Sequence, residues 1–225
     1  MVEIRFLGHS SFEFSWGDRM VLVDPWLVER SREVHRLIPP AIRQEEVRRC
    51  DAILLSHEHF DHCDPYDVSL IASRTTCQVI GPEDALAKVN VNPRQKVHVS
   101  EGESFSVVGI DLTVTRAIHP QSTHPVGFIL NAGGKFIYFA GDTYEFNDMR
   151  SFNADLAILP IGGTYTMDVL SAVTAVKLIN PQFVIPMHYN TFPRIEADVK
   201  DFESRVNSLT RSKPVVLRPG EKFDL

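Results

Sequence analysis

Apolar and polar side chains alternate over most of the first 23 residues, and a period of two is typical of β-strands. The pattern covers residues 2–7, 11–16 and 20–23, and Gly17-Asp18 supplies a tight turn between the last two segments. Asp24-Pro25 ends the third segment. We therefore expect the chain to begin as a meander of three strands.

Residues 26–50 lose this periodicity. They contain Pro39-Pro40 and mix charged side chains with isolated large apolar ones such as Trp26 and Leu27. We expect an excursion over the surface, with a short helix over residues 41–49.

Two later regions alternate short apolar runs with longer helical patterns. The first predicts strands at 52–55 and 77–80 and helices at 66–73 and 82–88; the second predicts strands at 155–159, 182–186 and 214–217 and helices at 168–179 and 195–209. Thr166 or Asp168 would cap the helix over 168–179, and Asn180-Pro181 would end it. This alternation predicts α/β layering.

The middle of the chain is richer in strands. We expect strands at 104–108, 110–117, 127–131 and 135–140, with turns such as residues 131–134 between them. They predict a second sheet with antiparallel pairs. No low-complexity tract or linker interrupts the sequence, so we expect one domain spanning residues 1–225.

The composition of the chain excludes some classes of function. The formal net charge is -6, and Lys and Arg are scattered without a basic stripe, which argues against a large nucleic-acid interface. No apolar stretch approaches the roughly 20 residues that a membrane helix needs, and the chain begins directly as a strand rather than as a signal peptide. We expect a cytoplasmic enzyme with a small-molecule substrate and no membrane partner. The sequence is compatible with a homo-oligomer.

The three cysteines, Cys50, Cys63 and Cys77, lack metal-site spacing and are expected to be reduced thiols. Cys63 directly follows a histidine-rich segment and could approach a metal there. A buried loop thiol is the interpretation we favour for it.

The densest chemistry lies in His57-Glu58-His59-Phe60-Asp61-His62, which places four metal-binding side chains directly after the strand at 52–55. Three later strands are also followed by a metal-binding type of residue: His119, Asp142 and His188. Layered α/β folds place their chemistry at such strand ends.

These five histidines and two aspartates exceed what one tetrahedral zinc ion can use, so two metal ions are expected. Imidazole and carboxylate donors favour zinc, manganese or iron over calcium, and nickel fits the same donor set. The absence of a certain thiolate ligand favours a catalytic site over a structural one.

The chain resembles the metallo-β-lactamase superfamily of binuclear metal hydrolases in the order and spacing of its metal-binding residues. The residues that carry the resemblance are the hexad of residues 57–62, His119, Gly141-Asp142-Thr143 and His188. The segments 7–11, 24–25, 161–167 and 186–193 look like the branch of ascorbate-6-phosphate lactonase and related metal-dependent hydrolases. The resemblance spans nearly the whole chain. It implies a four-layer αββα sandwich with the site at one edge, between two sheets.

The resemblance further implies which residues hold each ion. The first ion would be held by His57, His59 and His119, and the second by Asp61, His62 and His188. Asp142 would bridge the two. The segment 119–124 also contains His124, which could replace or assist His119; we favour His119 because it directly follows a strand.

We expect a water held between the two ions to attack as hydroxide, with Asp61 as both ligand and proton acceptor. The substrate would be a small ester, lactone or phosphoester. Glu58 and Phe60 occupy the variable positions of the hexad and receive no catalytic role.

Other residues are weaker candidates. His9 could support a metal ligand or contact substrate, or could be purely structural. The backbone of Gly162-Gly163 could face an anionic substrate, although a tight turn is the interpretation we favour. Asp24 would hydrogen-bond a ligand histidine. Further residues could line the cleft: Tyr189, Asn190, Trp26, Leu27 and Phe192.

Three alternatives remain. A phosphodiesterase or nuclease of the same superfamily is disfavoured by the acidic balance, and a glyoxalase-like thioesterase by the lack of a C-terminal helical substrate domain. A non-hydrolytic metal-binding or redox protein would be revealed by bound iron without hydrolysis. We discount β-lactam hydrolysis, because no export signal is visible.

Overall fold

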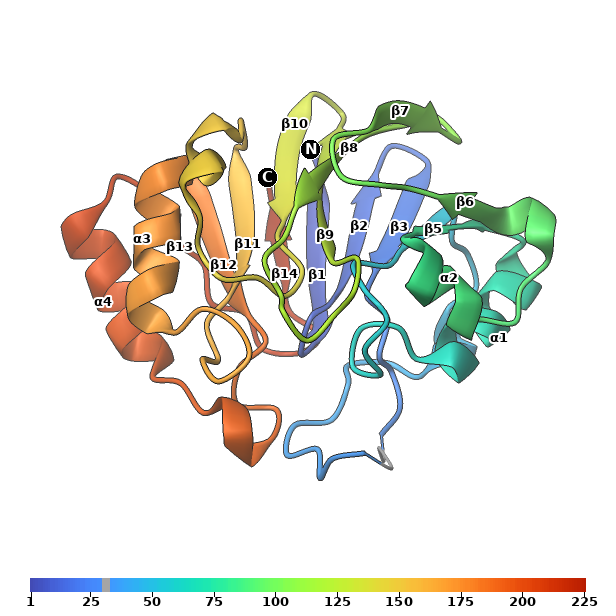
Figure 1. Ribbon diagram of the computed structural model, residues 1–225, viewed down its shortest axis with the longest axis horizontal. Helices are drawn as coiled ribbons and strands as arrows, with labels where there is room; N and C mark the ends of the chain where they lie inside the picture. The colour runs from blue at the N-terminus through green and yellow to red at the C-terminus, as the bar shows by residue number, and fades with distance from the viewer. Residues whose placement is uncertain (30–32) are drawn as a thin grey trace.

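The computed structural model describes residues 1–29 and 33–225 and contains two facing β-sheets, with helices on both outer sides (Figure 1). The first sheet has the strand order β14-β1-β2-β3-β4-β5-β6. These strands are β1 (Glu3–Gly8), β2 (Ser11–Trp16), β3 (Arg19–Val23), β4 (Ala52–Leu54), β5 (Gln78–Gly81), β6 (Lys96–His98) and β14 (Lys222–Asp224). The expected meander β1-β2-β3 is antiparallel, and β3 to β6 are parallel.

The second sheet has the order β13-β12-β11-β10-β9-β8-β7. Its strands are β7 (Ser104–Val107), β8 (Ile110–Arg116), β9 (Val126–Ala132), β10 (Lys135–Phe139), β11 (Leu156–Pro160), β12 (Phe183–Met187) and β13 (Lys213–Pro214). The expected antiparallel pairs link β7 to β10, and β10 to β13 are parallel. Both sheets are therefore half antiparallel and half parallel.

Helices cover the outer faces. Helices α1 (Pro65–Thr75) and α2 (Glu83–Lys88) lie outside the first sheet, and α3 (Val169–Ile179) and α4 (Val199–Leu209) lie outside the second (Figure 1). Together with the two sheets they form the four-layer αββα sandwich that the family resemblance implies. No helix in the described residues is long and apolar enough to cross a membrane.

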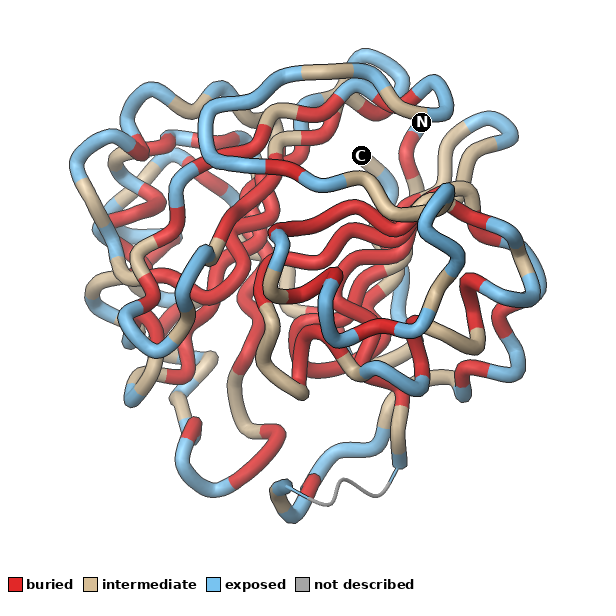
Figure 2. Tube along the Cα trace, turned by 45° about the vertical axis from the view of Figure 1, so that its right-hand side comes forward, coloured by how far each residue is buried: buried red, intermediate tan, exposed pale blue. Residues whose placement is uncertain are grey.

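Strand β3 illustrates how alternation divides the apolar side chains. Val21 and Val23 join the main core between the sheets, whereas Leu22 joins a second cluster beneath α1 and α2. Burying a side chain of this size stabilises the fold by roughly 1.5–3 kcal/mol. Figure 2 shows the central strands as the most deeply buried part of the chain.

Helix ends follow their capping residues. Asp168 accepts a hydrogen bond from Ser171 N and caps α3, while Thr166 does not cap it. Asn180, at φ 53°, ends α3 in the left-handed region that asparagine tolerates. The start expected for α4 at residue 195 was four residues early, because Pro193–Ile195 forms a separate 3-10 turn and Asp198 is the actual cap.

The excursion differs most from expectation. The helix expected over 41–49 is wrong: only a 3-10 turn at Gln44–Glu46 forms, since the apolar residues there have no helical spacing. Part of the excursion, residues 30–32, lies outside the described residues. Strands β6 and β14 were not predicted, and further 3-10 turns occur at Pro93–Gln95 and Asn147–Ser151.

Candidate metal centre

Six polar residues follow strand ends and meet at one edge of the sandwich. From the first sheet come His9 after β1, Asp24 after β3 and His57 after β4; from the second come His119 after β8, Asp142 after β10 and His188 after β12. The backbone joins the two sheets here, because His188 N donates to His9 O at 2.9 Å and Val126 N donates to Ser56 O at 3.0 Å. The residues of both sheets are thus held in one place.

His57, His59 and His119 form the first cluster of possible donors. His59 Nδ1 lies 3.0 Å from His57 Nε2 and 3.2 Å from His119 Nε2. Nitrogen atoms bound at 2.0–2.1 Å to a tetrahedral zinc ion are about 3.3 Å apart. The spacing of this cluster fits a common metal ion.

Hydrogen bonds on the far side of each ring indicate which nitrogens carry lone pairs. Ser56 Oγ donates to Asp24 and contacts His57 Nδ1 at 2.9 Å, so His57 Nδ1 is the donor in that contact. His59 Nε2 lies 3.2 Å from the carbonyl oxygen of Gln121 and must donate to it. The lone pairs of His57 Nε2 and His59 Nδ1 therefore point at each other, an arrangement that a cation between them stabilises.

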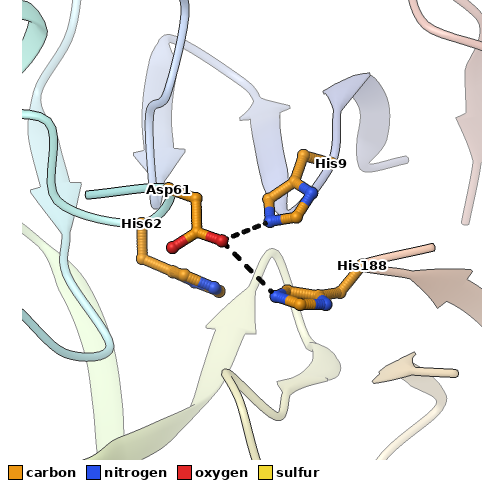
Figure 3. Close-up of side chains that lie close together, drawn as sticks. All are labelled: His9, Asp61, His62 and His188. Atoms are coloured by element: carbon orange, nitrogen blue, oxygen red, sulfur yellow. Dashed lines mark hydrogen bonds and ion pairs between the residues drawn. The ribbon is translucent and has the colours of Figure 1, made fainter. Parts of the chain in front are cut away.

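His9, Asp61, His62 and His188 form the second cluster (Figure 3). Asp61 Oδ2 lies 3.2 Å from His9 Nε2 and 3.7 Å from His188 Nε2. The ring centroids of His9 and His188 are 4.2 Å apart. Asp61 thus lies between a histidine of each sheet.

Asp142 lies between the two clusters. Its Oδ1 is 3.2 Å from His62 Nε2, and its Oδ2 is 3.2 Å from His188 Nε2 and 3.9 Å from both His57 Nε2 and His119 Nε2. A single carboxylate therefore reaches both groups of donors.

Burial and charge act on these groups in opposite directions. Burial, supported by the nearby His62, lowers the pKa of His57 well below its usual value. Burial also opposes the charged form of His62, but Asp142 and Asp24 raise the pKa of His62 well above normal. Burial likewise opposes ionisation of Asp142, yet His188 and His62 hold its pKa well below the usual range. The centre keeps its carboxylate charged.

Two buried atoms show that the residues suit a metal. His62 Nε2 and Asp142 Oδ1 lack any hydrogen-bond partner although both are inaccessible to solvent. His62 Nδ1 bonds the carboxylate of Asp24, so Nε2 is the nitrogen that faces Asp142 Oδ1, 3.2 Å away. A buried nitrogen beside a buried carboxylate oxygen is costly unless a cation, either a proton on the ring or a metal ion, lies between them.

The supporting backbone is strained. His9, Asp24 and His188 have φ values of 60°, 44° and 54°, in the left-handed region that costs a non-glycine residue roughly 1–2 kcal/mol. Gly141 shows how closely the strand ends approach, because a Cβ there would lie 2.8 Å from both Ser56 Cβ and Val126 O. Strain of this kind is often stored at functional sites.

His124 and Cys63 lie outside both clusters. His124 is exposed and its Nδ1 contacts Asp84 of α2 at 2.6 Å, so His119 and not His124 reaches the other donors. Cys63 is buried in the apolar cluster under α1 and α2, and burial raises the pKa of its thiol to about 12. Its position matches a buried loop thiol.

Several residues expected to contact substrate are engaged by other parts of the protein. The N–H of Gly163 donates to Met167 O at 2.9 Å and is therefore engaged within its own loop. Asn190 bonds the backbone of Ala197 through both ends of its amide, and Tyr189 packs against the main core. These two residues position the loop after β12 rather than line the cleft. His9 is buried, and burial together with His188 lowers its pKa to about 3; it contacts Asp61 rather than open space.

A cavity of about 590 Å³ opens directly above the two clusters. Five of the donor residues line its floor: His59, Asp61, His119, Asp142 and His188. Phe60 and Phe192 belong to its apolar wall, whereas Trp26 lies behind Phe60 and Leu27 belongs to the cluster under α1. Three apolar residues were expected in the wall: Trp26, Leu27 and Phe192. Of these, Phe192 lines the cavity, and Phe60 lines it as well.

Sequence reasoning missed other parts of the site. Ser56 supports His57, and Thr143 Oγ1 accepts from Ile118 N at 2.9 Å, next to His119. Both lie inside or beside the motifs and could have been noticed there. The cavity residues Gln121, Tyr165 and Arg194 carry no spacing signal of their own.

Comparisons with known proteins agree with this geometry. A protein-family model described as "Beta-lactamase superfamily domain" matches residues 3–188. A UPF0173 metal-dependent hydrolase from Thermofilum pendens is 36% identical over 231 residues, covering 98% of each chain. The structure of Igni18, a metallo hydrolase from Ignicoccus hospitalis, has a TM-score of 0.80 and 30% identity and covers 100% of this chain and 99% of its own.

A possible metal-dependent hydrolase from Veillonella parvula, at 16% identity and a TM-score of 0.81 over 100% of both chains, shares the fold. The family match and the relatives together extend over the strands that supply every donor described above. The chain therefore belongs to the metallo-β-lactamase superfamily and is a metal-dependent hydrolase.

Proposed function

We propose that this hydrolase holds two divalent metal ions and cleaves an ester, lactone or phosphoester bond in a small molecule. The observation that carries the proposal is the position of Asp142, which contacts donors of both clusters at the floor of the cavity. A carboxylate in contact with two donor groups suits a pair of ions better than a single one.

The donors divide between the two ions as follows. His57, His59 and His119 would hold the first, and Asp61, His62 and His188 the second, with Asp142 shared. Zinc suits imidazole and carboxylate donors in this number, and manganese, iron and nickel are compatible with the same set.

When bound, such ions act as Lewis acids and lower the pKa of a water molecule toward neutrality. The protein contributes the rest. Asp61 reaches the cavity floor and would accept the proton that the water gives up, while the hydrogen bond from His9 Nε2 to Asp61 Oδ2 fixes the orientation of that carboxylate. The wall formed by Phe60 and Phe192 limits the access of bulk water.

The size of the cavity and the net charge of the whole chain support a small substrate. A cavity of about 590 Å³ is within the range of small-molecule sites, roughly 300–1,000 Å³. The net charge of -6 gives no support to a nucleic-acid substrate.

The test is a substrate panel measured with protein stripped by chelator and reloaded with zinc, manganese, iron or nickel. The panel contains lactones, carboxylic esters, phosphomonoesters, phosphodiesters, thioesters and single-stranded RNA. We expect turnover of an ester, lactone or phosphoester that disappears on chelation and returns with metal. Turnover of RNA or thioesters alone, or no turnover with any of the metals, would contradict the proposal.

A further inference from the structure

One exposed basic side chain, Arg194, lines the cavity above the metal-binding residues. Among the described lining residues, Arg194 is the only arginine or lysine. It follows the apolar residues Phe192 and Pro193 of the wall, and Tyr165 lines the cavity beside it.

Two loops hold this pair in place. Arg194 Nη1 donates to the hydroxyl of Tyr165 at 3.0 Å, and Thr164 Oγ1 donates to the carbonyl oxygen of Arg194 at 2.7 Å. Arg194 comes from the loop after β12, which also carries His188. Tyr165 and Thr164 come from the loop after β11. These hydrogen bonds link the loop that carries Arg194 and His188 to the loop that carries Tyr165.

The packing beneath the pair is unusually tight. A Cβ on Gly162 would lie 2.2 Å from His188 O and 2.9 Å from Ile195 Cβ, so only glycine lets the two loops approach this closely. Ile195 is fully buried, and its carbonyl oxygen accepts from Asn190 N at 2.8 Å. Gly162 thus has a packing role that explains part of the Gly-Gly sequence.

The loop after β11 is also strained. Thr164 has φ 54°, a left-handed conformation that a β-branched residue rarely adopts. Because Thr164 O–H anchors the Arg194 backbone, the strained residue and the arginine belong to one arrangement.

Nearly all polar groups of Arg194 and Tyr165 are hydrogen-bond donors. Arg194 has five N–H groups, and no carboxylate of the described residues forms an ion pair with it. The Tyr165 hydroxyl accepts from Arg194 and keeps its own proton to donate. Glu33 also lines the cavity but belongs to a different loop.

We propose that Arg194 and Tyr165 form an anion-binding subsite that holds a carboxylate or phosphate group of the substrate, apart from the bond that is cleaved. This inference rests on the proposed function, because it assigns a substrate class to the same cavity. A planar guanidinium next to a hydroxyl donor suits the paired oxygens of either group.

The first test measures binding without hydrolysis. Isothermal titration of the zinc-loaded protein with benzoate and with phenylphosphonate compares the wild type with R194Q, R194K and the control R211Q, which changes an exposed arginine outside the cavity. We expect R194Q to weaken binding by about tenfold or more, R194K to recover part of the loss, and R211Q to stay near the wild type. A larger loss for phenylphosphonate assigns the subsite to phosphate, and a larger loss for benzoate assigns it to carboxylate.

The second test uses substrates that differ only in a distant charge. The ratio of kcat/KM for monophenyl adipate to that for phenyl hexanoate should favour the anionic ester in the wild type and fall in R194Q, mainly through KM. Hydrolysis of neither ester by the wild type would exclude simple phenyl esters from the proposed substrate class, whereas the binding data would still decide the subsite. Equal anion binding by R194Q and the wild type would overturn the subsite.

Discussion

Asp24 Oδ2 lies 2.7 Å from His62 Nδ1, and this contact determines which nitrogen of His62 faces Asp142. Asp24 also accepts from the backbone and the hydroxyl of Ser56, which in turn contacts His57. One buried carboxylate therefore orients a histidine of each metal group.

Replacing Asp24 with Asn should weaken metal binding by about 10–100-fold, because an amide no longer fixes the tautomer of His62 as a carboxylate does. Asparagine tolerates the φ of 44° at this position, so the fold should persist. Competition with a chelator measures the affinity. D155N, which changes a carboxylate that accepts from Phe136 N, is the matched control, and equal affinities in all three proteins would refute the role of Asp24.

His119 and His124 provide a pair of variants within one loop. H119A should lose one of two metal equivalents, because His119 Nε2 lies 3.2 Å from His59 Nδ1. H124A should retain both, since His124 contacts only Asp84 of the described residues. Metal content by mass spectrometry decides the assignment, and the reverse pattern would transfer the ligand role to His124.

Asp61 is predicted to act on the proton of the attacking water. D61A should reduce kcat by about 100-fold or more while the circular-dichroism spectrum stays unchanged. E58A, in the same hexad, should keep wild-type turnover, since Glu58 hydrogen-bonds Ser122 and lines no part of the cavity. Wild-type turnover by D61A would exclude Asp61 as the proton acceptor.

Much of the fold could be predicted because its strands repeat apolar residues with a clear period. Strand β3 alternates between two buried clusters, and α3 carries both its cap Asp168 and its terminating Asn180. Strands β6 and β14 escaped detection because three residues, two of them charged or polar, show no periodicity. Their pairing with β5 and β1 depends on contacts far apart in the sequence.

The donor residues could be predicted for a similar reason: each follows an apolar strand, and parallel strand ends meet at one edge. The position of His9 against Asp61 could not, because it depends on how the two sheets pack together. Arg194 was missed because a lone arginine in a loop carries no pattern until the cavity is formed.

The carboxyl group of Asp67, which lies outside the metal centre, should make the stability of the fold depend on pH. Burial, reinforced by Asp64, raises the pKa of Asp67 to about 7, against about 3.9 in an unfolded chain. Between these values the folded state holds a proton that the unfolded state has lost, so the stability from this group is complete below pH 4 and falls as pH rises through 7.

D67N removes this titration. Its free energy of unfolding relative to the wild type should increase by up to about 4 kcal/mol between pH 4 and pH 7. Urea unfolding of chelated proteins measures the difference, and D148N, which changes an exposed carboxylate, is the control. A difference that stays constant with pH would show that Asp67 is ionised in the folded state.

Asp142 is proposed to be shared by two metal sites, and the stoichiometry of metal binding tests this arrangement most directly. Protein stripped by chelator is titrated with Zn²⁺ in a calorimeter. We predict two equivalents bound per chain in the wild type, and binding of one equivalent or none would contradict a two-metal centre.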